Sequence, residues 1–214
     1  MSMPLNSRLM ALDADGVLLD YNRAYAHAWQ RAFGEFPAER DPQAYWAIDR
    51  WAVTQLSDEL LARFRASFDA DFWRNVPALP NAVDACQRLS AAGYELVCVS
   101  ALSLEFAQAR LNNLKQHGFP IERVIATSNA GQQGGERSVK ADALQTLRPA
   151  AFVDDFLPYF NGVPQDMHRG LILREPNGSP NVGPELGGVQ STHADFAAFA
   201  DWWLGRSGDS TYEY

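Results

Sequence analysis

Apolar segments of strand length alternate with segments of helical spacing along most of the chain, and this alternation limits the possible folds most strongly. Helices are expected at residues 80–92, 104–117, 140–147 and 193–204, and strands at residues 9–12, 95–100, 123–127, 150–153 and 170–173. Such alternation is typical of βαβ units, in which helices connect parallel strands and cover both faces of the sheet. The sequence therefore predicts an α/β, Rossmann-like parallel sheet with helices on both faces.

One segment interrupts this alternation directly after the first strand. Residues 22–35, 42–51 and 57–75 show helical spacing of Ala, Leu, Phe and Trp, and Ser57 is followed by acidic residues, as at a helix start. An all-helical insert is therefore expected. Some of its aromatic residues are candidates either for the hydrophobic core of the insert or for the wall of a substrate pocket: Trp29, Tyr45, Trp46, Trp51, Phe72 and Trp73.

The length of 214 residues suits one core domain with a small inserted one. We expect the core to comprise residues 1–20 and 76–205, the helical insert residues 21–75, and a flexible C-terminal tail residues 206–214.

The formal net charge of -8 and the lack of a basic run argue against a nucleic-acid partner, which needs clustered Lys and Arg. A small phosphorylated substrate remains compatible, because a metal ion and a few cations neutralise it locally. No stretch resembles a signal peptide or a membrane span, so a cytoplasmic protein without a membrane partner is expected. A monomer or homodimer is also expected. Cys86 and Cys98 lack metal-cluster spacing and are expected to be reduced and buried.

Polar residues follow three of the expected strands at the point where each ends: Asp13, Ser100 and Asp154. Because the ligand crevice of an open parallel sheet lies beyond the carboxyl ends of its strands, these side chains are expected to converge. Asp15 lies two residues after Asp13, and the following Gly16 allows the backbone to turn back over the strand end.

Gathering Asp13, Asp15, Asp154 and Asp155 in one place requires cations. Two like charges about 4 Å apart repel by roughly 4 kcal/mol even at an effective dielectric near 20. Mg²⁺ suits hard carboxylate oxygens, and Lys140 is the expected second cation. Only two of the eighteen basic residues are lysines, and a compact ammonium, unlike a guanidinium, contacts a carboxylate and a phosphoryl oxygen as a point charge.

Taken together, these segments resemble the haloacid dehalogenase superfamily. The segment LDADGVLLD at residues 12–20 resembles its nucleophile motif, Ser100 after VCV its second motif, Lys140 its third and VDD at residues 153–155 its fourth, in the family order. The resemblance implies a haloacid dehalogenase-like core, with the helical insert placed where the family carries a cap that closes over the site and selects the substrate.

The resemblance further implies a Mg²⁺-dependent phosphatase that acts on a small phosphorylated metabolite through an aspartyl-phosphate intermediate. Asp13 would be the nucleophile, and Asp15 would first protonate the leaving alkoxide and then accept a proton from the hydrolytic water. The implied metal ligands are the carboxylates of Asp13 and Asp154 and the backbone carbonyl of Asp15. The implied phosphate-binding residues are Ser100, Ala101 and Lys140, and Asp155 would order a metal-bound water or orient Lys140.

Alternatives remain at this point. A calcium loop would need an oxygen ligand at Val17, which is absent. Dehalogenases of this superfamily lack the second aspartate, so Asp15 argues against one, whereas a phosphomutase stays open. In response-regulator receivers the acidic pair comes first rather than last, and a non-enzymatic phosphate-binding relative would be expected to lose an aspartate or the lysine.

The spacing of Lys140 and the shortness of the helical insert depart from the pattern of the superfamily, and the short insert indicates no particular substrate. Lys140 precedes Asp154 by only fourteen residues, fewer than in many members, so its helix could approach the site differently. The glycine-rich segment 129–135 is not followed by the Gly-Lys-Ser/Thr of a phosphate-binding loop and is interpreted as a surface loop.

Overall fold

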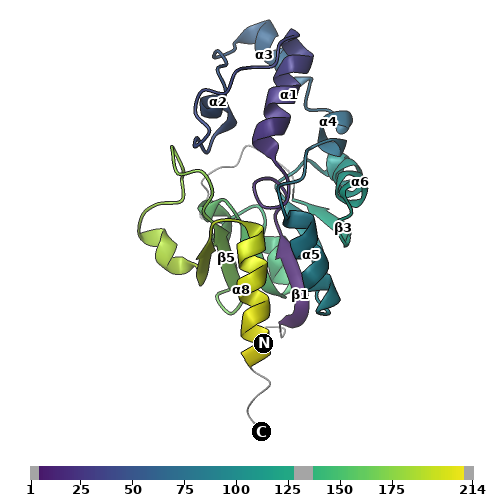
Figure 1. The fold of residues 1–214 in the computed structure, drawn as a ribbon, viewed down its shortest axis with the longest axis vertical. Helices are drawn as coiled ribbons and strands as arrows, with labels where there is room; N and C mark the ends of the chain where they lie inside the picture. The colour runs from purple at the N-terminus through teal and green to yellow at the C-terminus, as the bar shows by residue number, and fades with distance from the viewer. Residues whose placement is uncertain (1–4, 128–136, 210–214) are drawn as a thin grey trace.

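A computed structural model describes residues 5–127 and 137–209 of the chain. Six strands form one sheet in the order β3-β2-β1-β4-β5-β6, and every neighbouring pair is parallel. The predicted α/β, Rossmann-like architecture is confirmed (Figure 1). The strands are β1 (Asn6–Leu12), β2 (Glu95–Ser100), β3 (Ile121–Ala126), β4 (Pro149–Asp154), β5 (His168–Ile172) and β6 (Ser191–His193).

Helices cover both faces of the sheet, and alternate residues of β1 face opposite layers. Met10 and Leu12 belong to the cluster that packs against α5 (Ala82–Ala91), α6 (Ala107–His117) and α8 (Phe196–Asp209). Leu9 and Ala11 belong to the cluster on the other face, which includes residues of α7 (Ala141–Leu147) and of the 3-10 helix η2 (Leu157–Phe160). A strand buried on both faces reads as a continuous apolar run, which is why β1 is visible in the sequence.

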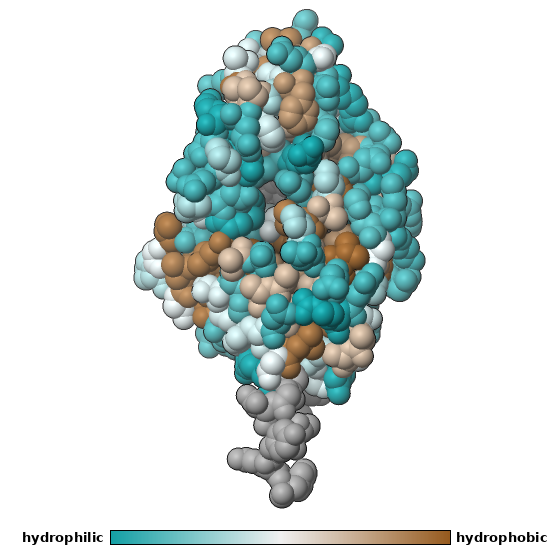
Figure 2. Space-filling view, in the orientation of Figure 1, coloured by the Kyte–Doolittle hydropathy of each residue, from teal (hydrophilic) through white to brown (hydrophobic). Residues whose placement is uncertain are grey.

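The helical insert contains α1 (Tyr21–Phe33), α2 (Ala47–Arg50), α3 (Asp58–Arg65) and α4 (Ala70–Arg74) and lies above the carboxyl ends of the strands (Figure 1). On the face shown in Figure 2 its surface is mostly hydrophilic. Several of its aromatic rings pack inside the insert instead: Trp29 with Phe33 and Phe64, Trp51 with Phe36, and Phe72 with Phe68.

Two helices expected in the insert are shorter than predicted. Residues 42–51 contain only the four-residue α2, because the backbone before it bonds outside the insert: Tyr45 N donates to Asn177 O, and Asn177 N donates to Gln43 O. Residues 57–75 form two helices rather than one. Asp69 accepts a hydrogen bond from Phe72 N and thereby starts α4 as a separate helix.

The C-terminal region also differs from the prediction. β6 was missed because its three polar residues carry no apolar run, and the closing helix begins at Phe196 rather than at His193. Helix α8 continues through Asp209, so residues 206–209 of the expected C-terminal tail are helical. Residues 210–214 and the glycine-rich segment 129–135 lie outside the described residues.

Cys86 and Cys98 are free thiols and both are buried, as expected. Among the helices of residues 5–127 and 137–209, none is both long enough and apolar enough to cross a membrane.

Candidate active site

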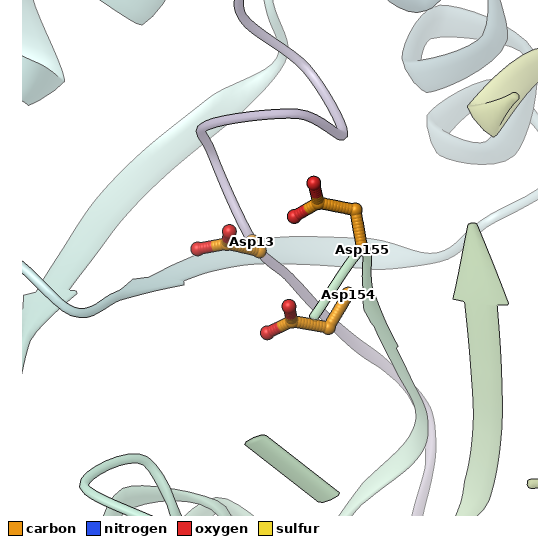
Figure 3. Close-up of side chains that lie close together, drawn as sticks. All are labelled: Asp13, Asp154 and Asp155. Carbon is orange, nitrogen blue, oxygen red and sulfur yellow. The ribbon is translucent and has the colours of Figure 1, made fainter. Parts of the chain in front are cut away.

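The pairing of β1 with β4 brings three carboxylates together. Leu12 pairs with Val153, and Asp13 N donates to Val153 O at 2.9 Å, so Asp13 lies beside the end of β4. Carboxylate oxygens of Asp13, Asp154 and Asp155 all lie within 4.8 Å of one another, and all three residues are buried (Figure 3). The first and fourth sequence motifs, at residues 12–20 and 153–155, therefore converge because β1 and β4 are neighbours in the sheet.

Lys140 joins two of these carboxylates. It lies at the N-terminal end of α7, and its Nζ is 2.6 Å from Asp13 Oδ1 and 2.6 Å from Asp154 Oδ2. Its side chain is fully buried, which disfavours the ammonium, yet Asp13 and Asp154 together raise the pKa of Lys140 above its ordinary value. The short spacing between Lys140 and Asp154 does not prevent this contact.

Asp15 faces a different cation. Gly16, with φ of 83°, turns the chain after Asp15, and Arg110 of α6 donates through Nη2 to both carboxylate oxygens of Asp15, at 2.8 and 2.7 Å. Burial raises the pKa of Asp15, and the Arg110 guanidinium opposes that rise. The Asp15 side chain keeps 26% of its surface exposed, so it still faces the cavity described below.

Asp155 is bound by Arg174, which follows β5. Arg174 Nε donates to Asp155 Oδ2 at 2.5 Å, and its guanidinium lies 4.5 Å from the ring centre of Tyr45. Burial raises the pKa of Asp155, and Arg174 opposes that rise. The Asp155 carbonyl accepts hydrogen bonds from Tyr45 Oη and from Asn181 Nδ2. Arg174 is thus the cation that binds Asp155 directly, while Lys140 binds Asp13 and Asp154; the role of Asp155 in ordering a metal-bound water or orienting Lys140 stays a prediction.

The sequence interpretation missed both arginines. Arg174 directly follows an apolar strand, so the rule that identified Asp13 and Asp154 would also have identified it. Arg110 is fully buried on a helix. The sequence feature that could have identified it is a charged residue on the helix face that also carries the buried Leu114. The described site therefore holds four carboxylates beside three cations, and Arg174 also pairs with Glu175: Asp13, Asp15, Asp154, Asp155 beside Arg110, Lys140, Arg174.

A cavity of about 450 Å³ lies between the helical insert and the ends of the strands. Asp13, Asp15 and Asp155 form part of its wall, and so do Ser100 and Ala101 at the end of β2. Of the six aromatic candidates in the insert, Tyr45, Trp46 and Trp73 line the cavity. Four further aromatic residues line it: Tyr21, Tyr25, Phe156 and Tyr159.

Gly16→Ala is expected to disrupt this site. A Cβ at position 16 would lie 2.2 Å from Asp155 Oδ2 and 2.7 Å from Arg174 Nε, so the ion pair would have to move. The positive φ costs about 1–2 kcal/mol in itself, and we expect a further loss of about 1–3 kcal/mol from overpacking. Gly34→Ala is the matched control, because Gly34 has φ of 88° but no atom within 4 Å of the added Cβ. Urea unfolding measures both; equal losses would contradict the close approach.

Residues 7–146, more than half of the chain, match the family described as 5′ nucleotidase, deoxy (Pyrimidine), cytosolic type C protein. The chain is 24% identical over 171 residues to a protein of Bordetella bronchiseptica named "Putative 5′(3′)-deoxyribonucleotidase", covering 78% of this chain and 84% of that protein.

Solved structures share the fold at low sequence identity. A HAD family hydrolase from Deinococcus radiodurans R1 with bound phosphate and sodium aligns with a TM-score of 0.60 and 17% identity, covering 94% of this chain and 96% of that one. A structure described as "putative beta-phosphoglucomutase from Thermotoga maritima" aligns with a TM-score of 0.59 and 14% identity, covering 92% and 99%. At these identities the alignments bear on the fold alone.

Proposed function

Because the chain belongs to the deoxyribonucleotidase family of cytosolic type C within the haloacid dehalogenase superfamily, and is a phosphoric monoester hydrolase, we propose that it dephosphorylates a nucleotide-like metabolite with Mg²⁺. The observation that carries the proposal is the buried ammonium of Lys140 between Asp13 and Asp154, of which Asp13 forms part of the wall of an aromatic cavity. The helical insert, residues 21–75, acts as the cap that closes this cavity.

Asp13 is the proposed nucleophile. Its Oδ1 is bound to Lys140, which holds the carboxylate in one orientation, and Asp13 lines the cavity where an ester would bind. Attack on phosphorus forms an aspartyl phosphate and releases the alcohol, and water then hydrolyses the acyl phosphate. Splitting the displacement into two steps requires an acid for the first and a base for the second.

Asp15 supplies both roles in this proposal. It lies on the same turn as Asp13, lines the cavity and carries the pKa-raising effect of burial. Protonated, it gives its proton to the leaving alkoxide oxygen; as the resulting carboxylate, it accepts a proton from the attacking water. Ser100, Ala101 and Lys140 bind the phosphoryl oxygens, Ser100 and Ala101 from the end of β2 and Lys140 from α7.

The donor set fits a hard divalent cation. Three buried carboxylates offer oxygen atoms within 4.8 Å of one another, and hard oxygen donors are the ligands that Mg²⁺ prefers. The carboxylates of Asp13 and Asp154 and the backbone carbonyl of Asp15 are the proposed ligands, and Asp155 is close enough to contribute. A bound Mg²⁺ supplies neutralisation of the charge on the phosphoryl group.

The aromatic cavity supports a nucleoside monophosphate as the substrate class. Its volume is within the usual range for small-molecule sites, and rings such as those of Trp46 and Trp73 offer flat surfaces on which a base stacks. The curated relative is named for deoxyribonucleotides, in agreement with this class. Asp15, held by Arg110, argues against dehalogenation, since a halide ion leaves carbon without needing a proton from an acid.

The test is hydrolysis of p-nitrophenyl phosphate and of a panel of deoxyribonucleoside and ribonucleoside monophosphates, with phosphate release as the readout. We expect turnover with Mg²⁺, loss of turnover after treatment with EDTA, and recovery when Mg²⁺ is restored. Activity that is unchanged by EDTA would contradict the metal requirement. Transfer of the phosphoryl group to a sugar phosphate rather than to water would identify a mutase instead.

A further inference from the structure

Arg110 lies next to the catalytic carboxylates but has no role in the mechanism above. Its side chain is fully buried, whereas Asp15, its carboxylate partner, retains exposure to the cavity. Desolvating a guanidinium costs several kcal/mol, which an ion pair offsets only with good geometry and satisfied hydrogen bonds. Among the described residues, however, Nε and Nη1 of Arg110 have no hydrogen-bond partner, so the pair is poorly optimised for stability.

The contacts of Arg110 constrain Asp15 from one side. One nitrogen, Nη2, donates to both oxygens of Asp15, which restrains the rotation of that carboxylate. The guanidinium also lies 5.1 Å from the ring centre of Trp73, another residue of the cavity wall. Arg110 itself does not line the cavity, so any effect on the reaction passes through Asp15 or Trp73.

The face of α6 that carries Arg110 also binds residues 74–76, the segment through which the chain returns from the cap to the core. Asn113 Nδ2 donates to the carbonyls of Arg74 and Val76 at 2.7 and 2.9 Å. His117 Nε2 lies 2.9 Å from the Val76 carbonyl. Residues 110, 113 and 117 are spaced by three and four positions and therefore share one side of the helix. Arg110 thus acts from a helix that is anchored to the base of the cap.

We propose that Arg110 is a positioning residue that holds the Asp15 carboxyl group in the orientation needed to protonate the leaving oxygen, with α6 linking that orientation to the return segment of the cap. This inference rests on the proposed function. It predicts a loss that depends on the leaving group, because an alkoxide requires the proton of Asp15 and p-nitrophenolate does not.

The experiment compares kcat/KM for a nucleoside 5′-monophosphate and for p-nitrophenyl phosphate in Arg110→Met. The ratio kcat/KM depends only on the steps from substrate binding to formation of the phosphoenzyme. It therefore reports the step in which Asp15 acts as an acid. General acid catalysis is worth about 10²–10⁴-fold; we expect a loss of at least about 30-fold on the nucleotide and of less than about 3-fold on p-nitrophenyl phosphate. Arg110→Lys should recover part of the nucleotide activity, because the charge remains but a single ammonium orients the carboxylate less well.

Two controls separate positioning from folding. Arg88→Met removes an arginine of α5 that pairs with Asp84 and Asp201 on the surface, and should leave both rates unchanged. In an Asp15→Asn background, Arg110→Met should cause no further loss on the nucleotide. If Arg110→Met does not fold, Arg110→Lys carries the comparison, with a smaller loss confined to the nucleotide.

The outcomes separate this inference from the proposed function. Equal losses on both esters, or no loss on either, would overturn the role of Arg110 and leave the phosphatase intact. A wild-type protein that hydrolyses neither ester would overturn both proposals.

Discussion

Asp13→Asn is expected to lower kcat for phosphate esters by at least about 10⁴-fold, since removing a covalent nucleophile costs several orders of magnitude. The asparagine amide has nearly the same shape as the carboxylate but is too weak a nucleophile to form an acyl phosphate. The measurement is phosphate release with Mg²⁺ present, together with acid quenching of the wild-type reaction to detect the phosphoenzyme.

Asp84→Asn is the matched control for this variant. Asp84 lies on α5, pairs with Arg88 and is largely exposed, so the same chemical change there should alter neither turnover nor folding by a measurable amount. An Asp13→Asn protein that retains turnover within about tenfold of the wild type would remove Asp13 from the mechanism and with it the aspartyl-phosphate route.

Lys140→Met is expected to have the largest effect on stability. The methionine fills much of the same volume, but it leaves the buried carboxylates of Asp13 and Asp154 without the ammonium that lies 2.6 Å from each. Removing one partner from a buried ion pair typically costs about 3–5 kcal/mol. We therefore expect the free energy of unfolding to fall by about that amount, and turnover to fall by about 10²–10³-fold because a phosphate-binding cation is lost.

Urea unfolding with and without Mg²⁺ measures the stability effect. Added Mg²⁺ should recover part of the lost free energy, because a divalent cation bound between the carboxylates replaces some of the missing positive charge. Lys115→Met is the control, since the other lysine of the chain pairs with Glu122 on the surface. Equal stability of Lys140→Met and the wild type in the absence of metal would show that the ammonium does not neutralise this cluster.

The sequence predicted the sheet well because its central strands are buried on both faces. Strand β2 begins and ends at the predicted residues, β1 ends directly before Asp13, and β4 ends at Asp154. Strand β6 escaped detection because a short polar edge strand depends on pairing with β5 rather than on its own apolar residues. The length of helix α2 was overestimated for a related reason. The backbone of the segment before it forms hydrogen bonds with Asn177, which is more than a hundred residues away in the sequence.

The sequence by itself determined which residues end the strands, and in a parallel sheet these ends lie along one edge. The strand order, which places β4 beside β1, then brings Asp13 and Asp154 together. The sequence also identified Lys140 as the lysine that neutralises these two carboxylates. Only the tertiary structure decided how the remaining charges pair, with Arg110 bound to Asp15 and Arg174 bound to Asp155. The physical reason is that strand ends follow from local apolar patterns, whereas ion-pair partners depend on the packing of α6 and of the segment after β5, which are distant in the chain.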